Sequence, residues 1–255
     1  MKEYIESQMA LFGKSEIIGF GDEDYLVKEI DRTIANTLIV KNHYSAKFYN
    51  ASYIHLGVYS KQELVGVLQF GYAMNPASQE GVVANTKIDE YLELNRMWLE
   101  DKMPRNSESM AISYAIKYIK RKYPKIKWIQ SFADERCHRF GVVYQAANFT
   151  YCGEHTSNFW ILDGIWYHKS LMERNPDLSK AAAFLQRNKD RATTTEFRQF
   201  RYVYFISRKS RKDLQLEVYP YPKNNAGQVS VVETADIQSA GASAILASRS
   251  TRWGD

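Results

Sequence analysis

The chain has 255 residues, of which 45% are hydrophobic and 14% aromatic, enough to bury the core of one large domain. Its 34 lysines and arginines exceed its 29 acidic residues, and the net charge of +5 fits either a polyanionic partner or a solvated basic surface. Two cysteines exclude a disulfide framework, and no paired cysteine or histidine spacing indicates a structural zinc site.

Charges occur throughout the first residues, and no run of about 20 apolar residues follows them. We therefore expect no signal peptide, no membrane span and a location in the cytoplasm of the cell that makes the protein.

Hydrophobic periodicity predicts the elements of the first part of the chain. Glu16–Phe20 is a short apolar run that we expect to form an edge strand. Apolar residues recur every four positions over Tyr25–Lys41, which predicts a long amphipathic helix. Tyr53–Tyr59 and Leu64–Phe70 alternate as the strands of a hairpin, and Asn75–Asn85 is a loop long enough to be functional.

The next stretch alternates strand and helix. Leu92–Leu99 and Ile126–Phe132 are strand-like, and the segment between Pro104 and Pro124 has helical spacing. A short helix over Phe140–Ala147 and a strand that starts at Phe149 complete a βαβαβ order. This order favours a parallel core, with ligand groups at the carboxyl ends of the strands.

A hairpin and a basic segment follow. Asp163-Gly164 is a two-residue turn signal between Asn158–Leu162 and Ile165–His168, and Leu178–Asn188 is expected to be helical. Residues 187–212 contain nine basic and two acidic residues, interleaved with aromatics, and include the predicted strand 202–206. Such a segment either contacts nucleic acid or is a solvated face. The candidate DNA contacts are Arg187, Arg191, Arg198, Arg201, Arg208 and Lys209.

The composition changes at Asp213. Prolines and asparagines between Pro220 and Asn225 break the pattern and the end is rich in serine and alanine, so we expect residues 213–255 to form a poorly ordered, flexible tail. Residues 1–212 would be one α/β catalytic domain.

The order of these elements resembles the GNAT acetyltransferase superfamily, which implies a mixed central sheet flanked by helices. The stretch Gly141-Val-Val-Tyr144-Gln-Ala-Ala-Asn148-Phe149 resembles the fourth-helix signature of that superfamily. Its glycine-rich pyrophosphate signature is absent, because Asp101–Ser109 contains Pro104 and no glycine. A helix start with Ser107 and Ser109 remains as the candidate cofactor contact, although both serines fit capping equally well, and the missing glycines argue against acetyl-CoA.

A narrower resemblance rests on five motifs in order: Asn42-His43-Tyr44-Ser45, Leu94–Leu99, Pro104–Ser109, Phe132-Ala133-Asp134 and Gly141–Phe149. Together they resemble the Mom family of bacteriophage DNA-modification enzymes. The resemblance implies conversion of the N6 amino group of adenine in double-stranded DNA to a methylcarbamoyl (acetamido-type) derivative, which protects the DNA from restriction.

Four residues are the catalytic candidates: Arg96, Asp134, Tyr144 and His43. Arg96 lies in an apolar strand, where it either orients the donor or forms a salt bridge to Glu93 or Asp134. Asp134 ends a strand and either accepts a proton or caps the next segment. The superfamily makes Tyr144 a general acid, with packing as the alternative; His43 either caps a helix or accepts the proton.

The resemblance also implies iron, for which His43, Tyr44 and Asp134 would be the ligands. Because an enzyme acting on adenine N6 must take the base out of the duplex, we expect an aromatic pocket, with Tyr44, Tyr72 and Trp98 as candidate walls.

Two other functions remain open. One is an acyl-CoA-dependent N-acyltransferase that acts on a small amine or a protein; the other is a non-catalytic DNA-binding protein on this fold. The sequence leaves open the donor, the target sequence and the oligomeric state, with a homodimer among the options.

Overall fold

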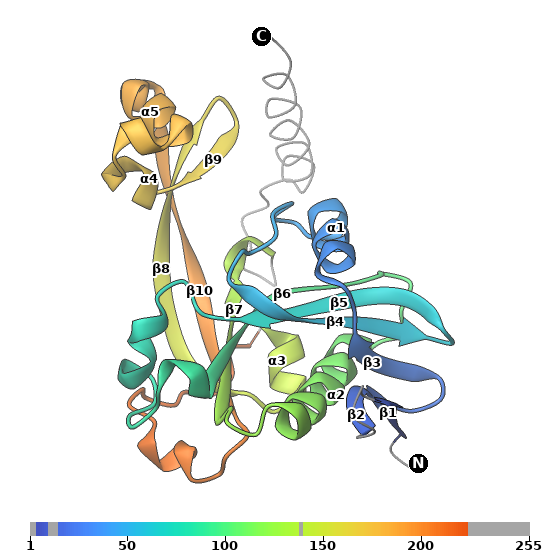
Figure 1. Ribbon diagram of the computed structural model, residues 1–255. Helices are drawn as coiled ribbons and strands as arrows, with labels where there is room; N and C mark the ends of the chain where they lie inside the picture. Colours follow the sequence, from blue (N-terminus) through green and yellow to red (C-terminus); the bar gives the residue numbers. More distant parts are fainter. Residues whose placement is uncertain (1–3, 10–14, 138–139, 224–255) are drawn as a thin grey trace. The chain divides into compact units, whose positions relative to one another are not determined.

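The structure is a computed structural model that describes residues 4–9, 15–137 and 140–223 (Figure 1). The chain divides into two compact units. Unit 1 comprises Met1–Ala133, Gly141–Gly153 and Arg201–Pro222, and unit 2 comprises Asp134–Phe140, Glu154–Phe200 and Lys223–Asp255. The division at residue 212 into a catalytic domain and a tail, expected from the sequence, stays a prediction. The contacts between residues instead group them into units with other boundaries.

The strands form one sheet in the order β1-β2-β3-β4-β5-β6-β7-β10-β8-β9. Their bounds are β1 Tyr4–Met9, β2 Ser15–Gly21, β3 Tyr25–Glu29, β4 Ser52–Ser60, β5 Glu63–Gly71, β6 Tyr91–Leu99, β7 Trp128–Asp134, β8 Thr150–Leu162, β9 Ile165–His168 and β10 Thr193–Phe205. The α-helices are α1 Arg32–Asn42, α2 Ser107–Lys122, α3 Val142–Ala146, α4 Ser170–Glu173 and α5 Lys180–Arg187. A mixed α/β fold with a central sheet flanked by helices is confirmed.

Two helices cover opposite faces of the sheet in unit 1. Ala35 and Ile39 of α1 pack against Val67 of β5, with Trp98 of β6 at the edge of the same cluster. Figure 1 shows α2 and α3 on the other face, where the buried side of α2 includes Ala111, Ala115 and Ile119. The helical spacing of these apolar residues therefore correctly predicted α2.

The helix predicted over Tyr25–Lys41 is wrong in its first half. Residues 25–29 form β3, which pairs antiparallel with β4, and α1 begins only at Arg32. Asp31 is the N-cap of α1 and accepts a hydrogen bond from the Thr33 amide at 2.6 Å. Residues four apart lie on one side in a strand as well as in a helix, so the spacing alone did not separate the two.

The parallel part of the sheet contains fewer strand pairs than we expected from the sequence. β6 and β7 are parallel, whereas the successive pairs from β1 to β6 are antiparallel. β10 lies between β7 and β8, so the third strand of the βαβαβ stretch is not the neighbour of the second. Likewise, Glu16–Phe20 falls in β2, which has a neighbour on each side and is not an edge strand.

A β-bulge interrupts the pairing of β5 with β6. Gln69 pairs with Arg96 and Phe70 with Leu94, so Asn95 is an extra residue in β6. Its side chain accepts from the Ser52 hydroxyl at 2.8 Å and donates to the Tyr72 carbonyl at 3.1 Å. Bulges re-aim neighbouring side chains, and this one lies between two charged residues of the strand, Glu93 and Arg96.

The start of the predicted tail is ordered against unit 1. Leu214 forms an isolated bridge with Val83, and Leu214 and Leu216 pack on the cluster that contains Tyr91 and Trp128. Placing the tail boundary at Asp213 was therefore too early, because these apolar residues have a surface to cover. Residues 224–255 lie outside the described part of the chain.

Cys137 and Cys152 are not joined in a disulfide. Among the described residues, we find no helix with the length and apolar character needed to span a bilayer.

Candidate functional site

Charged and polar side chains of unit 1 gather around the bulge of β6. We call this group the β6 polar cluster; its members are His43, Tyr49, Glu93, Arg96, Gln130 and Arg201. They come from the segment after α1, from β6, from β7 and from β10. Two of the four catalytic candidates, His43 and Arg96, are in it.

Arg96 bonds to main-chain carbonyls and not to a carboxylate. Its Nε donates to the Lys47 carbonyl at 3.1 Å, and its Nη1 donates to the Asn95 carbonyl at 2.6 Å. The guanidinium carbon lies 5.9 Å from the centre of the Tyr49 ring. The salt bridge that was the alternative for Arg96 is therefore replaced by contacts that fasten the segment after α1 to β6. A partly exposed guanidinium with donors to spare can still meet an anion or a carbonyl.

His43 is the C-cap of α1 and is held as a neutral imidazole. Its Nδ1 lies 2.8 Å from the Ser45 hydroxyl and accepts from the Ser45 amide at 3.1 Å. Burial, helped by the positive charge of Arg96, lowers the pKa of His43 to about 3. Because Nδ1 accepts, the neutral ring carries its proton on Nε2. A group this weakly basic is a poor proton acceptor near neutral pH.

Glu93 is a site residue that the sequence analysis named only as a partner for Arg96. It lies between Leu92 and Leu94. A carboxylate inside an apolar strand is the sequence feature that could have identified it as a site residue. Its carboxylate accepts from the Asn95 amide at 3.2 Å and from the Gln130 amide at 2.9 Å. Burial nevertheless raises the pKa of Glu93 above its ordinary value. A buried carboxyl with a raised pKa is a better base than a solvated one.

Tyr49 was missed altogether, since a tyrosine in a short polar connection carries no pattern. Burial and then the charge of Glu93 raise the pKa of its hydroxyl, which stays protonated and able to donate.

Asp134, the third catalytic candidate, belongs to unit 2. Its side chain is buried, and both of its oxygens accept from the Arg136 guanidinium, with Nε at 3.0 Å from each. The Arg136 amide also donates to it at 3.0 Å. This agrees with the capping role weighed for Asp134, because its hydrogen-bonding capacity is taken up next to it in the chain.

Tyr144, the fourth candidate, lies in an aromatic group of unit 1. Its ring centre is 5.4 Å from that of Tyr202 and 5.6 Å from that of Phe149. This environment fits the packing role weighed for it.

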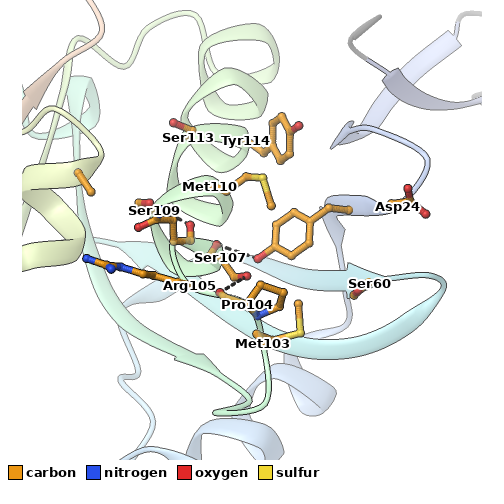
Figure 2. Close-up of a pocket in the computed structure, with 13 residues that line it drawn as sticks. Asp24, Ser60, Met103, Pro104, Arg105, Ser107, Ser109, Met110, Ser113 and Tyr114 are labelled. Atoms are coloured by element: carbon orange, nitrogen blue, oxygen red, sulfur yellow. Dashed lines mark hydrogen bonds between the residues drawn. The ribbon is translucent and has the colours of Figure 1, made fainter.

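Ser107 and Ser109 line a pocket at the N-terminal end of α2, with a volume of about 420 Å³ (Figure 2). The Ser107 hydroxyl donates to the Pro104 carbonyl at 2.7 Å, and the Ser109 hydroxyl donates to the Asn106 carbonyl at 2.9 Å. With these protons engaged, neither hydroxyl donates to a phosphate without first breaking a bond. A pocket exists at the predicted cofactor contact, but its two serines donate to carbonyls of the preceding turn, and the N-cap of α2 is Asn106.

The iron ligands proposed from the sequence do not form an evident metal site. Among residues 4–9, 15–137 and 140–223, no group of three or more His, Cys, Asp and Glu side chains is placed to hold a metal ion. His43 already accepts at Nδ1 from the Ser45 amide, Asp134 is paired with Arg136, and the Tyr44 ring lies tilted against that of His43 at 4.3 Å between centres. This donor set does not fit iron, and we derive no step through a metal.

The aromatic walls proposed from the sequence separate into two groups. Trp98 packs beside α1 in the core. Tyr72 is 37% exposed and its ring lies 5.1 Å from that of Tyr53, which is 44% exposed. Because Tyr72 also bonds through its carbonyl to Asn95, the exposed Tyr53–Tyr72 pair lies next to the β6 polar cluster.

The six candidate DNA contacts differ in availability. Arg198 is paired with Glu135 and Glu154, and Arg191 is paired with Asp163. Arg201 is partly buried and donates to Gln130 at 2.9 Å. Arg187, Arg208 and Lys209 are exposed without a carboxylate partner in the described residues. The DNA contacts therefore stay a prediction, in which Arg187, Arg208 and Lys209 have no carboxylate partner competing with phosphate among the described residues.

The comparisons with known proteins agree with the sequence resemblance. Residues 24–223 match the Mom protein family. The methylcarbamoylase Mom of Escherichia phage Mu is 50% identical over 213 residues, which cover 82% of this chain and 88% of that protein.

Among solved structures, a GNAT-family acetyltransferase from Bacillus anthracis is 11% identical, covers 74% of this chain and 98% of its own, and has a TM-score of 0.41. The ribosomal-protein-S5-alanine acetyltransferase of Vibrio fischeri is 15% identical, covers 55% and 86%, and has a TM-score of 0.39. Scores of this size carry no argument about activity.

Proposed function

The chain belongs to the Mom protein family, and from this membership we propose how its β6 polar cluster serves the reaction of the family. It is a methylcarbamoylase and a phage DNA-modification enzyme, as its phage Mu relative is a methylcarbamoylase. The acceptor that we propose is the N6 amino group of adenine in double-stranded DNA, whose modification would protect the DNA from restriction.

The chemistry needs a proton acceptor. The lone pair of the adenine amino group is delocalised into the ring, so N6 is a weak nucleophile. During transfer, a bond forms between N6 and the carbon of the methylcarbamoyl unit, and the leaving group of the donor departs with its electron pair. One N6–H bond breaks and its proton must pass to a base.

Glu93 is the base that the observations favour. His43 has a pKa of about 3, and Asp134 is held by Arg136, whereas Glu93 is a partly buried carboxylate with a raised pKa. This replaces His43 and Asp134 as proton acceptors. Arg96, beside Glu93 on β6, keeps its proposed role of orienting a carbonyl or an anionic group of the donor.

The target base must leave the duplex to reach such a cluster, at a cost of about a few kcal/mol. Stacking on aromatic rings contributes about 1–3 kcal/mol per base. The exposed Tyr53–Tyr72 pair, next to Asn95 at the bulge of β6, supports the proposal that it stacks on the extruded adenine.

DNA phosphates would meet the basic residues left exposed. In unit 2, Lys180, Phe184 and Arg187 are exposed on α5, while Ala182 and Leu185 are buried. Spacings of four and three put these exposed side chains on one face of the helix, opposite the buried ones. In unit 1, Arg208 and Lys209 are exposed. A homodimer remains a proposal that these observations neither favour nor oppose.

An acyl-CoA-dependent N-acyltransferase is the second candidate, favoured by the pocket at the start of α2. The engaged hydroxyls of Ser107 and Ser109 and the lack of glycine in this segment count against a pyrophosphate there. Calorimetry with CoA, together with the melting temperature, tests it: tight binding with thermal stabilisation would favour the acyl-CoA reaction.

The decisive experiment measures modified DNA. Plasmid DNA from cells that express the protein is digested to nucleosides, and mass spectrometry measures mass-shifted deoxyadenosine. We expect it with the wild type, and a loss of about a hundredfold or more with Glu93→Gln or Arg96→Ala. No shifted nucleoside with the wild type would reject the proposed reaction. Undiminished modification by Glu93→Gln, or abolition by Asp134→Ala in a folded protein, would reject our choice of base.

A further inference from the structure

A line of hydrogen bonds joins three strands behind the proposed base. Arg201 of β10 donates through Nη1 to Gln130 Oε1 at 2.9 Å, and Gln130 of β7 donates through Nε2 to Glu93 Oε2 at 2.9 Å. Gln130 is only 3% exposed. A guanidinium has donors only and a carboxylate has acceptors only, so the amide between them has one orientation that satisfies both.

We propose that Arg201 is a positioning residue that acts through Gln130. It keeps Glu93 ionised and fixes the orientation of the carboxylate through the hydrogen bond to Oε2. This inference rests on the proposed role of Glu93. The other oxygen, Oε1, accepts from Asn95 at 3.2 Å, so Glu93 is fixed from the bulge as well as from the neighbouring strand. A chain of hydrogen bonds in a low-dielectric interior polarises its members in the same direction, which carries the effect of the guanidinium to the carboxylate.

Arg201 is unsuited to the DNA contact for which its sequence position suggested it. Its guanidinium carbon lies 4.7 Å from the centre of the Phe132 ring. Burial lowers the pKa of Arg201, with Cys152, Glu93 and Tyr91 as the neighbours that act in the opposite direction. A partly buried cation held beside a ring and an amide is better suited to act as a fixed internal charge than to bind phosphate.

The charge balance around Glu93 gives the direction of the effect. Burial raises the pKa of Glu93, while the bonds from Asn95 and Gln130 and the charges of Arg201 and Arg96 lower it. The Tyr49 and Tyr91 hydroxyls interact electrostatically with the same carboxylate and have raised pKa values themselves. Removing Arg201 or the Gln130 amide takes away one of the interactions that lower the pKa of Glu93. The effect of burial then raises that pKa further, and Glu93 takes up a proton at a higher pH.

The test uses the full chain with Arg201→Met and Gln130→Leu. Difference infrared spectroscopy follows the carboxyl band that is absent in Glu93→Gln and gives the titration midpoint of Glu93. We expect Arg201→Met to raise that midpoint by about one pH unit, which lowers the ionised fraction about tenfold below the midpoint. DNA modification should fall in parallel, with unchanged affinity for duplex DNA.

Arg208→Met is the matched control, because Arg208 is a nearby exposed arginine. It should weaken duplex binding in a salt-dependent way and leave the Glu93 midpoint where it is. Arg201→Lys, which keeps the charge and one donor, should restore part of the midpoint. A weakened DNA affinity with an unmoved midpoint in Arg201→Met would overturn the proposal and return Arg201 to the DNA surface.

The midpoint is read without the reaction, so the two ideas fail separately. If Arg201→Met shifts the midpoint but Glu93→Gln still modifies DNA, the positioning by Arg201 stands and the catalytic role of Glu93 falls.

Discussion

The amide of Gln130 donates to the carboxylate of Glu93 at 2.9 Å, across the parallel pair of strands β6 and β7 in register. Through Gln130, which also accepts from Arg201 of β10, this contact links the carboxylate of an apolar strand to a cation and explains how Glu93 is tolerated there. It also makes the sheet itself part of the proposed site. The predictions below follow from the burial and the partners of particular side chains.

The ionisation of Glu93 should cost folding free energy. Its pKa in the folded chain is raised above 4.5, so the protonated form is favoured by folding. Any stability that the carboxyl contributes is present below the ordinary pKa and is lost as pH rises through the raised one. Denaturant unfolding of wild type and Glu93→Gln across this range should show the difference moving in favour of the variant as pH rises. A difference that is independent of pH would contradict the assignment.

The neutral state of His43 predicts the opposite slope. Its pKa is lowered from 6.5 to about 3, so its contribution is present above 6.5 and is lost as pH falls toward 3. At about pH 4 the wild type should have lost up to about 3 kcal/mol relative to His43→Gln, because each pH unit in which only the unfolded chain binds the proton costs about 1.4 kcal/mol. Parallel stability curves for the two proteins would show that His43 is not buried as described.

Two arginines of the basic segment should behave differently toward DNA. Arg187 is exposed on α5, whereas Arg198 is paired with Glu135 and Glu154. Arg187→Gln should reduce the slope of log affinity against log salt by about 0.9, as expected for one lost phosphate contact. Arg198→Gln should leave the slope nearly unchanged and destabilise unit 2. Fluorescence anisotropy with duplex DNA at several salt concentrations measures both slopes, and equal slopes would refute the distinction.

The function of Arg96 should depend on the two-pronged geometry of its guanidinium and not only on its positive charge. Arg96 holds the Lys47 carbonyl through Nε and the Asn95 carbonyl through Nη1. Lysine can reach one of these carbonyls at a time. We expect Arg96→Lys to lose most DNA modification while its melting temperature falls only slightly. Full modification by Arg96→Lys would contradict this prediction and would show that a positive charge at position 96 is sufficient.

Gly71 should be intolerant of a side chain. A Cβ at this position would lie 2.1 Å from the Ala51 carbonyl oxygen, a main-chain atom that cannot move aside. Gly71 pairs with Glu93, so any shift of the strand also disturbs the site. Gly71→Ala should cost about 1–3 kcal/mol of unfolding free energy. Gly81→Ala, where nothing lies within 4 Å, is the control and should change stability little.

The sequence by itself determined the outline of this protein. The spacing of apolar residues located α2, and the alternation of β4 and β5 gave their hairpin, because both signals come from burial of one face of a single element. The match of five short motifs in order was enough to indicate the family. Where two periodicities coincide, as at Tyr25–Glu29, only the pairing of β3 with β4 decided for a strand.

Only the tertiary structure decided which polar residues act together. Glu93, Gln130 and Arg201 are far apart in the chain, and their line of hydrogen bonds exists because β6, β7 and β10 are adjacent in the sheet. The same folding gives Arg201 and Arg198, two of the predicted DNA contacts, partners within the chain. An arginine looks the same in the sequence whether its guanidinium binds a phosphate, a carboxylate or an amide. Burial and distance determine which of these partners it binds, and both depend on the fold.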